Sequence, residues 1–328
     1  MIGVKLRDFI VKKNPKRCAI VCHHNADPDA ICSAYALRDL LKKIVPALET
    51  YIVAPEGVSL PSKRIAEYMG GIVFHDELEE PDIIVLVDTC TFAQLGILSN
   101  TLMESLCPLI VIDHHRPHSD VVKRASLLIS DETASSTCEL IYLMFNELKV
   151  DLDPKVALAL LTGIIYDSRR FINASSRTFR VAAELIDKGA NHAEALKLLQ
   201  VPMDISEKIA RLKAAQRLKI YKIHGWLVVT SYVSSYEASA ARALIDLGAD
   251  VVFVAGGEKP EVRVSARSRT SFYQQTKIHL GRDVMEKVGV YIQGAGGGHA
   301  TAAGANGIGD PEKVLELCIK LILEKFGQ

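Results

Sequence analysis

Short apolar runs rich in valine and isoleucine alternate with amphipathic helical segments through the first 130 residues of the chain. The helical segments repeat their apolar side chains at helical spacing, as in the segment Ala30–Val45. This alternation is typical of βαβ units, in which helices cover both faces of a mostly parallel sheet. The sequence therefore predicts an α/β fold whose first strands are Cys18–Cys22, Tyr51–Ala54, Ile83–Val87 and Leu109–Ile112.

Helical patterns follow one another after about residue 130, and strands resume after about residue 222. A length of 328 residues is itself a soft indication of two domains. We therefore expect a first domain over residues 1–190, a helical linker over 191–221 and a smaller mixed α/β domain over 222–328. The helices predicted between the two sets of strands are Ser136–Leu148, Pro154–Asp167, Thr178–Lys188 and Ile205–Leu218. The elements predicted in the second domain are the strands Trp226–Ser231, Val251–Ala255, Glu261–Ala266 and Val290–Gln293, and the helices Glu237–Leu247 and Pro311–Phe326.

The charge balance excludes several kinds of partner. The chain has 39 basic and 39 acidic side chains, so no global field attracts long nucleic acid or an anionic membrane, and an anionic substrate needs a local positive site. The longest nearly uninterrupted apolar stretch, Val156–Tyr166, is too short for a membrane helix. Seven scattered cysteines suit a reducing compartment. We therefore expect a cytoplasmic protein that makes no membrane contact.

Acidic and imidazole side chains follow three of the predicted strands. The carboxyl ends of parallel strands meet at one edge of a sheet, where open α/β sheets bind ligands, so these side chains should face one crevice. One such residue is ordinary turn chemistry, but three groups together are not. The groups are His23, His24, Asp27 and Asp29 after the first strand, Asp88 after Ile83–Val87, and Asp113, His114 and His115 after Leu109–Ile112.

Carboxylates this close together repel one another unless cations neutralise them. A mixture of oxygen and nitrogen ligands suits Mn, Fe or Zn better than Ca. Asp167 ends a predicted helix, where a carboxylate is unfavourable beside the negative end of the helix dipole without a nearby cation. An exposed helix end is the alternative for Asp167 alone. The sequence therefore predicts a metal centre in the first domain.

A glycine-rich segment, Gly294–Gly304, follows the last predicted strand. Its free backbone N–H groups, leading into residues compatible with a helix, predict an anion site that contains His299. The glycine spacing does not match a dinucleotide-binding loop, and a purely structural turn is the alternative. Upstream, a phosphate clamp is predicted from side chains that would share one face of a strand: Arg263, Ser265, Arg267 and Arg269.

Together these motifs resemble the DHH phosphoesterase family over essentially the whole chain. The segment from His23 through Asp27 to Asp29, Asp88 after an apolar strand, Asp113-His114-His115 and Asp167 resemble the four motifs of its N-terminal domain. The run Gly296-Gly297-Gly298-His299 resembles the signature of its DHH-associated C-terminal domain. The resemblance implies two divalent metals, typically Mn²⁺ with Mg²⁺ or Co²⁺ as alternatives. It also implies an active site in the cleft between the two domains.

The resemblance further implies a role for each matching residue. His23 and Asp27 would bind one metal, Asp29, His114 and Asp167 the other, and Asp88 both. His115 would act with Asp88 in catalysis by contacting the scissile phosphate, and Asp113 would support the histidines from behind. His24 matches no ligand position. The residues that would position the rest of the nucleotide are Arg267, Ser268, Gly296, Gly297, Gly298 and His299.

The C-terminal signature argues against type II pyrophosphatases, and full-length RecJ exonucleases carry further domains. The resemblance then favours compact members: nanoRNases, pAp phosphatases and dinucleotide phosphodiesterases. We expect two-metal hydrolysis of a phosphate ester in a short single-stranded oligonucleotide or a small nucleotide. Two alternatives stay open, a non-catalytic partner in a replication or repair complex and a nucleotide-sensing module. A homodimer is also left open.

Overall fold

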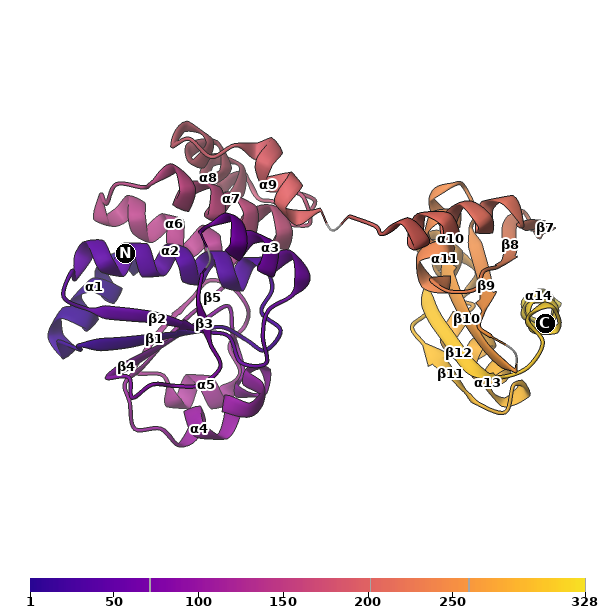
Figure 1. Cartoon of the computed structure of the whole chain (residues 1–328), viewed down its shortest axis with the longest axis horizontal. Helices are drawn as coiled ribbons and strands as arrows, with labels where there is room; N and C mark the ends of the chain where they lie inside the picture. The colour runs from indigo at the N-terminus through magenta and orange to yellow at the C-terminus, as the bar shows by residue number, and fades with distance from the viewer. Residues whose placement is uncertain (71, 201, 259, 328) are drawn as a thin grey trace. The chain divides into compact units, whose positions relative to one another are not determined.

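The chain folds into two compact units, Met1–Val201 and Pro202–Gln328. A computed structural model describes residues 1–70, 72–200, 202–258 and 260–327, and each unit is built around one six-stranded sheet (Figure 1). The predicted α/β class, with a parallel sheet first and a mixed sheet second, is confirmed. No helix among the described residues is long and apolar enough to cross a membrane.

The sheet of the first unit is entirely parallel and has the strand order β3-β2-β1-β4-β5-β6. The four predicted strands are present as β1, β2, β4 and β5, whereas the short edge strands β3 and β6 were not predicted. The strand order reverses between β1 and β4, and this reversal opens a crevice at the carboxyl ends of both strands. The strands are β1 Arg17–Val21, β2 Glu49–Val53, β3 Phe74–His75, β4 Ile83–Val87, β5 Leu109–Asp113 and β6 Leu127–Ser130.

Helices cover both faces of this sheet (Figure 1). Alternate residues of β4 belong to two separate apolar cores, with Val85 in the core beneath α2 and α7 and Leu86 in the core beneath α4 and α5. Burial on both faces explains why the strands are continuous runs of Val, Ile and Leu. The helices are α1 Ile2–Lys13, α2 Pro28–Ile44, α3 Leu60–Tyr68, the 3₁₀ helix η1 Phe92–Leu98, α4 Ser99–Glu104, α5 Ser119–Arg124, α6 Thr137–Leu148, α7 Pro154–Asp167, α8 Ser176–Asp187 and α9 His192–Leu199.

The sheet of the second unit is mixed, with the order β11-β12-β10-β9-β8-β7 and a parallel β8–β9 pair. Helix α10 packs on α11 over one face, and α14 contacts β8 and β9. The strands are β7 Lys219–Ile223, β8 Trp226–Tyr232, β9 Val251–Gly256, β10 Glu261–Ser268, β11 Ala295–Gly298 and β12 Ala302–Ile308. The helices are α10 Ile205–Gln216, α11 Glu237–Asp246, α12 Thr270–Thr276, the π helix η2 Leu280–Met285, α13 Glu286–Tyr291 and α14 Pro311–Phe326.

The expected secondary structure around the glycine-rich segment is wrong. The residues predicted as the strand Val290–Gln293 lie at and beyond the end of helix α13. Val288 in this helix and Ile292 at its C-cap are buried one helical turn apart, while Val290 is exposed. The glycine run forms strand β11, which pairs antiparallel with β12, so the segment is a β-hairpin and does not begin a helix. An apolar run of three residues cannot distinguish a strand from the last turn of a helix.

Candidate metal centre

The crevice at the carboxyl ends of β1, β4 and β5 gathers the predicted metal ligands. His23 follows β1, Asp88 follows β4, and Asp113 is the last residue of β5. Asp167, the last residue of α7, lies in the same crevice, where its carboxylate contacts His114. The order of the strands thus brings together side chains that lie up to about 140 residues apart in sequence.

One group of potential ligands contains His23, Asp27 and Asp88. Nε2 of His23 lies 3.8 Å from Oδ1 of Asp27 and 4.0 Å from Oδ2 of Asp88. Nδ1 of His23 lies 2.8 Å from the carbonyl oxygen of His24. This backbone contact occupies Nδ1, so Nε2 is the nitrogen that faces the two carboxylates.

A second group contains Asp29, His114 and Asp167, with one potential ligand atom from each within 4.8 Å of the others. Nε2 of His114 lies 2.9 Å from Oδ2 of Asp167 and 3.6 Å from Oδ1 of Asp88. Nδ1 of His114 again faces a backbone carbonyl, that of Ala134 at 3.3 Å. Asp88 therefore directs one carboxylate oxygen at each group.

Local backbone features hold two of these carboxylates. Asp27 is the N-cap of α2, and its Oδ1 accepts hydrogen bonds from the N–H groups of Asp29 and Ala30 at 3.0 and 3.1 Å. Asp88 adopts a left-handed backbone conformation with φ 53°, which few residues other than glycine adopt, although aspartate tolerates it better than most. This turn directly after β4 points the Asp88 carboxylate into the crevice.

Sequence reasoning missed Thr137, which connects both groups of ligands from the first turn of α6. Its hydroxyl donates to Oδ1 of Asp88 at 3.0 Å, and its N–H donates to Oδ2 of Asp29 at 2.7 Å. The N–H of Cys138 donates to the other oxygen of Asp29 at 3.0 Å. The helix was predicted over Ser136–Leu148, and the capping pattern Ser136-x-x-Glu139 agrees with its start, but neither signal identifies the side chains that α6 faces.

The crowding of acidic groups changes their proton affinity. Burial, together with the negative charges of Asp167 and Asp27, raises the pKa of Asp29 to about 8. Burial and the charges of Asp29 and Asp27 raise the pKa of Asp88 well above its usual value. Clustered carboxylates resist ionisation because their charges repel one another. A cation bound among them stabilises their ionised forms.

The arrangement fits a divalent cation. One buried polar atom in the crevice, Oδ2 of Asp113, has no hydrogen-bond partner among the residues that the structure describes. Buried polar atoms without partners are costly, and an imidazole nitrogen close to several carboxylate oxygens is a donor set that Mn²⁺, Fe²⁺ and Zn²⁺ accept. The residues that would hold cations are His23, Asp27, Asp29, Asp88, His114 and Asp167.

His115 and Asp113 form a hydrogen-bonded pair at the edge of the crevice, and together with Asp88 and His114 they make a third group of potential ligands. Oδ1 of fully buried Asp113 accepts hydrogen bonds from the backbone N–H of His115 at 2.8 Å and from its Nδ1 at 2.9 Å. The hydrogen bond to Asp113 raises the pKa of His115 to about 9. His115 is half exposed, so its Nε2 can donate to an anion in the crevice. His24 is turned away and donates from Nδ1 to the carbonyl of Gln94 at 2.7 Å.

Most of the residues predicted to contact substrate in the second unit line one pocket of about 540 Å³. Arg267, Gly297, Gly298 and His299 are among them, whereas Gly296 and Ser268 do not line it. The clamp residues Arg263 and Ser265 line it as well, because they alternate with Arg267 along β10, but Arg269 lies beyond the end of that strand. Two further polar residues of the lining that were not predicted are Glu237 and Asn306.

The three glycines of strand β11 are required for different structural reasons. A side chain at Gly296 would meet the carbonyl oxygen of Met285 at 1.9 Å, so this glycine lets β11 pack against η2. Gly298 has φ 131°, a conformation that other residues rarely adopt. Gly297 has open space around it, and its backbone is accessible from the pocket. The N–H of His299 donates to the carbonyl of Ala302 at 2.7 Å and closes the turn.

Sequence comparisons agree with this geometry. Residues 17–164 match the N-terminal domain of the DHH family, and residues 228–328 match the DHHA1 domain. An uncharacterized protein of Methanocaldococcus jannaschii is 36% identical over 319 residues, which cover 93% of this chain and 94% of that protein. The chain belongs to the DHH family. The family predicted from the four motifs and the glycine-histidine signature is therefore confirmed.

Two relatives carry names that describe an activity. A bifunctional oligoribonuclease and PAP phosphatase of Bacillus subtilis is 26% identical over 299 residues, 87% of each chain. A cyclic-di-AMP phosphodiesterase of Listeria monocytogenes is 28% identical over 326 residues, which are 92% of this DHH-family chain but only 46% of that enzyme. The predicted enzyme class, a hydrolase of phosphate esters, is confirmed.

One solved structure supports the fold over nearly the full length. The crystal structure of an exopolyphosphatase-related protein from Bacteroides fragilis aligns with a TM-score of 0.64 at 19% sequence identity. The alignment covers 98% of this chain and 96% of that one. Because the identity is low, the likeness shows the fold alone.

Proposed function

We propose that this DHH-family protein is a divalent-metal-dependent phosphodiesterase that hydrolyses short oligonucleotides or small nucleotides with two cations, Mn²⁺ being the expected metal. The observation that carries the proposal is the position of Asp88 between two groups of potential ligands. A carboxylate shared by two groups is the arrangement that two-metal phosphoesterases require. The named activities of the Bacillus and Listeria relatives support a nucleotide substrate.

The residues of the crevice have separable roles in this proposal. Bound divalent cations would supply Lewis-acid stabilisation of phosphoryl oxygens and would lower the pKa of an attacking water. His115 is held through Nδ1 by Asp113, which leaves Nε2 to donate a hydrogen bond to an oxygen of the scissile phosphate. Thr137 keeps the Asp88 carboxylate in a fixed orientation, so that it need not reorganise during the reaction.

The second unit is proposed to hold the remainder of the nucleotide. Arg267 and the backbone of Gly297 and Gly298 line the same pocket as His299, so cationic, N–H and imidazole donors converge there. Nε of Arg267 is buried and finds no hydrogen-bond partner in the described part of the chain, and a phosphate oxygen would satisfy it. Because the chain has a net charge of zero, this local site has to supply the attraction for an anionic substrate.

A panel of labelled oligonucleotides of two to about twenty-four residues tests the proposal. The panel also includes pAp and linear and cyclic dinucleotides, and the labels are placed at either end to reveal the polarity of cleavage. With Mn²⁺ present, we expect the highest kcat/KM for the shortest substrates, and no turnover after chelation.

A matched pair of histidine variants provides the control. His114→Gln should abolish hydrolysis, while His75→Gln, which removes an imidazole paired with Glu79 at the surface, should leave it intact. Absence of turnover of every nucleotide in the presence of Mn²⁺ would contradict the proposal and favour a nucleotide-sensing or non-catalytic role.

A further inference from the structure

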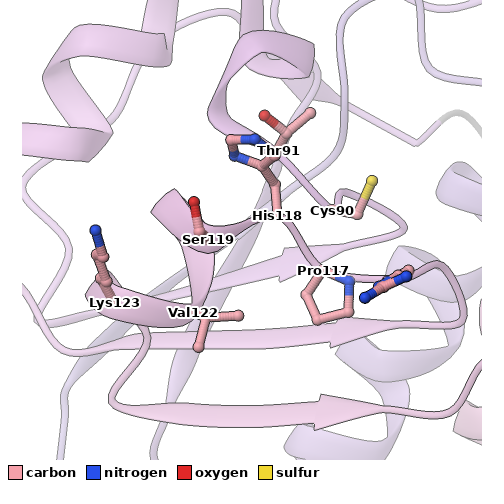
Figure 2. Close-up of a pocket in the computed structure, with 8 residues that line it drawn as sticks. Cys90, Thr91, Pro117, His118, Ser119, Val122 and Lys123 are labelled. Carbon is pink, nitrogen blue, oxygen red and sulfur yellow. The ribbon is translucent and has the colours of Figure 1, made fainter.

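A second pocket, of about 660 Å³, opens in the first unit at the edge of the parallel sheet (Figure 2). One wall is the loop after β4, with Cys90 and Thr91, and the other is the segment 116–123, which follows β5 and includes most of α5. The N–H of His118 donates to the carbonyl of Cys90 at 2.8 Å and ties the two walls together. None of the roles described above uses this pocket.

The same two loops carry the metal centre and the pocket. Cys90 lies two residues after Asp88, and Arg116 directly follows His115. Two residues of extended chain span at most about 7 Å, so the backbone of each wall begins beside a group that would contact a cation or the scissile phosphate. The pocket is therefore placed next to the centre by covalent connection.

The charged side chains that line the pocket are cationic, although the carboxylate of Asp120 contacts the lining residues His118 and Thr91. The lining includes Arg116 and Lys123 but no carboxylate, and neither cation forms an ion pair within the parts of the chain that the structure describes. His118 also lines the pocket, and its Nδ1 lies 2.8 Å from Oδ1 of Asp120. Although the chain has no net charge, two unpaired cations on one wall create a local positive potential that attracts an anion.

The neutral lining residues suit a phosphorylated ligand as well. Figure 2 shows the polar ends of Ser119 and Lys123 directed to the same side of the pocket. Pro117 and half-exposed Val122 add apolar surface that a sugar ring can contact. Guanidinium and ammonium donors together with a hydroxyl are the groups that proteins commonly use to bind phosphate oxygens.

We propose that this pocket is a second phosphate subsite, which binds the phosphate group adjacent to the scissile one. The inference rests on the proposed function, because it assumes that the scissile phosphate lies at the centre formed around Asp88. It specifies the substrate class further: nucleotides with at least two phosphate groups are preferred over those with one. Arg116 and Lys123 are the residues that make this selection.

Three diadenylates that differ only in terminal phosphates test the subsite: ApA, pApA and ApAp. The wild-type protein should hydrolyse at least one phosphorylated form with a kcat/KM ten- to hundredfold above that of ApA, a range typical of a charge-assisted contact and equal to about 1.4 to 2.8 kcal/mol. The Arg116→Gln/Lys123→Gln variant should lose this preference while it hydrolyses ApA at the wild-type rate. The two phosphorylated forms distinguish a 5′ from a 3′ phosphate.

The control variant removes the same number of charges elsewhere. Lys12→Gln/Lys42→Gln alters α1 and α2, which cover the opposite face of the sheet from α5, and it should keep the preference. An unchanged preference in the Arg116/Lys123 variant, or an equal loss on all three substrates, would overturn the subsite.

If the wild type hydrolyses none of the diadenylates, the subsite is judged by binding, whereas the proposed function fails only if no nucleotide of the full panel is hydrolysed. Calorimetry should then give a dissociation constant for pApA or ApAp at least tenfold below that for ApA in the wild type, and equal constants in the Arg116/Lys123 variant. Equal constants in the wild type would overturn the subsite independently of catalysis.

Discussion

The candidate sites of the two units are built from different kinds of secondary structure. In the first unit, potential ligands lie at the ends of strands that can be recognised in the sequence as runs of Val and Ile. The reversal of strand order between β1 and β4 brings these ligands together. In the second unit, His299 lies at the tip of a β-hairpin made almost entirely of glycine and alanine, for which hydrophobic periodicity gives no signal. The position of a site at the edge of a parallel sheet therefore follows from the order of the strands. The position of a site on this hairpin depends on close backbone contacts that only glycine allows.

The difference predicts that variants of the two units separate metal binding from substrate binding. His299→Ala should lower kcat/KM ten- to hundredfold and leave the Mn²⁺ content and melting temperature unchanged. The reason is the loss of a charge-assisted hydrogen bond to the substrate phosphate, which is worth about 1.5 to 3 kcal/mol. Kinetics, elemental analysis and thermal unfolding on one preparation measure all three. Lost metal or lowered stability with kcat/KM preserved would contradict this division between the units.

A second variant tests the inner support of the metal centre. Thr137→Val keeps the shape of the side chain but removes the hydroxyl that donates to Asp88, and it should weaken Mn²⁺ binding about tenfold. Thr137→Ser keeps the hydroxyl and should bind Mn²⁺ as the wild type does. Calorimetric titration gives both affinities. Equal affinities for the Val and Ser variants would mean that the Thr137 hydroxyl does not support metal binding.

The smallest effect is expected from Asp283 in the second unit, and it concerns stability alone. Although burial opposes its ionisation, hydrogen bonds from Arg282, the N–H of His279 and Lys325 lower the pKa of Asp283 to about 2. A lowered folded-state pKa stabilises the fold above pH 4, and this contribution disappears as the pH falls through about 2. Asp283→Asn should therefore lower the free energy of unfolding by about 1 to 2 kcal/mol at pH 7, with unchanged Mn²⁺ binding.

Fluorescence measures this loss within the second unit, because Trp226 is the only tryptophan of the chain and packs on Phe272. Urea unfolding followed at Trp226 should show wild type and Asp283→Asn converging between pH 4 and pH 2. A gap that stays constant over that range would mean that the carboxylate charge of Asp283 contributes nothing.

Sequence reasoning identified the architecture of the first unit because its signals are periodic. The strand Ile83–Val87 and the helix Pro154–Asp167 were predicted to the residue, since burial on both faces of the strand and a proline at the start of the helix leave few alternatives. The potential ligands followed from the placement of polar residues at strand ends.

Other features depend on contacts that no local pattern records. Thr137 lies 49 residues from Asp88 and 108 from Asp29, and only the packing of α6 against α2 brings it to both. Gly296 looks like part of an anion loop in the sequence, but its missing side chain serves the close packing of β11 on η2. The cationic pocket of Arg116 and Lys123 depends equally on the position of α5 beside the loop after β4.

The central claim is that the first unit holds two divalent cations with Asp88 between them. Titration of the metal-free full-length chain with Mn²⁺, followed by calorimetry and by the paramagnetic resonance of the bound ions, tests it most directly. The account predicts two ions per wild-type chain with a magnetically coupled signal, and loss of both the coupling and hydrolysis in Asp88→Asn. A single ion per wild-type chain, or an Asp88→Asn variant that binds two coupled ions and turns over substrate normally, would contradict it.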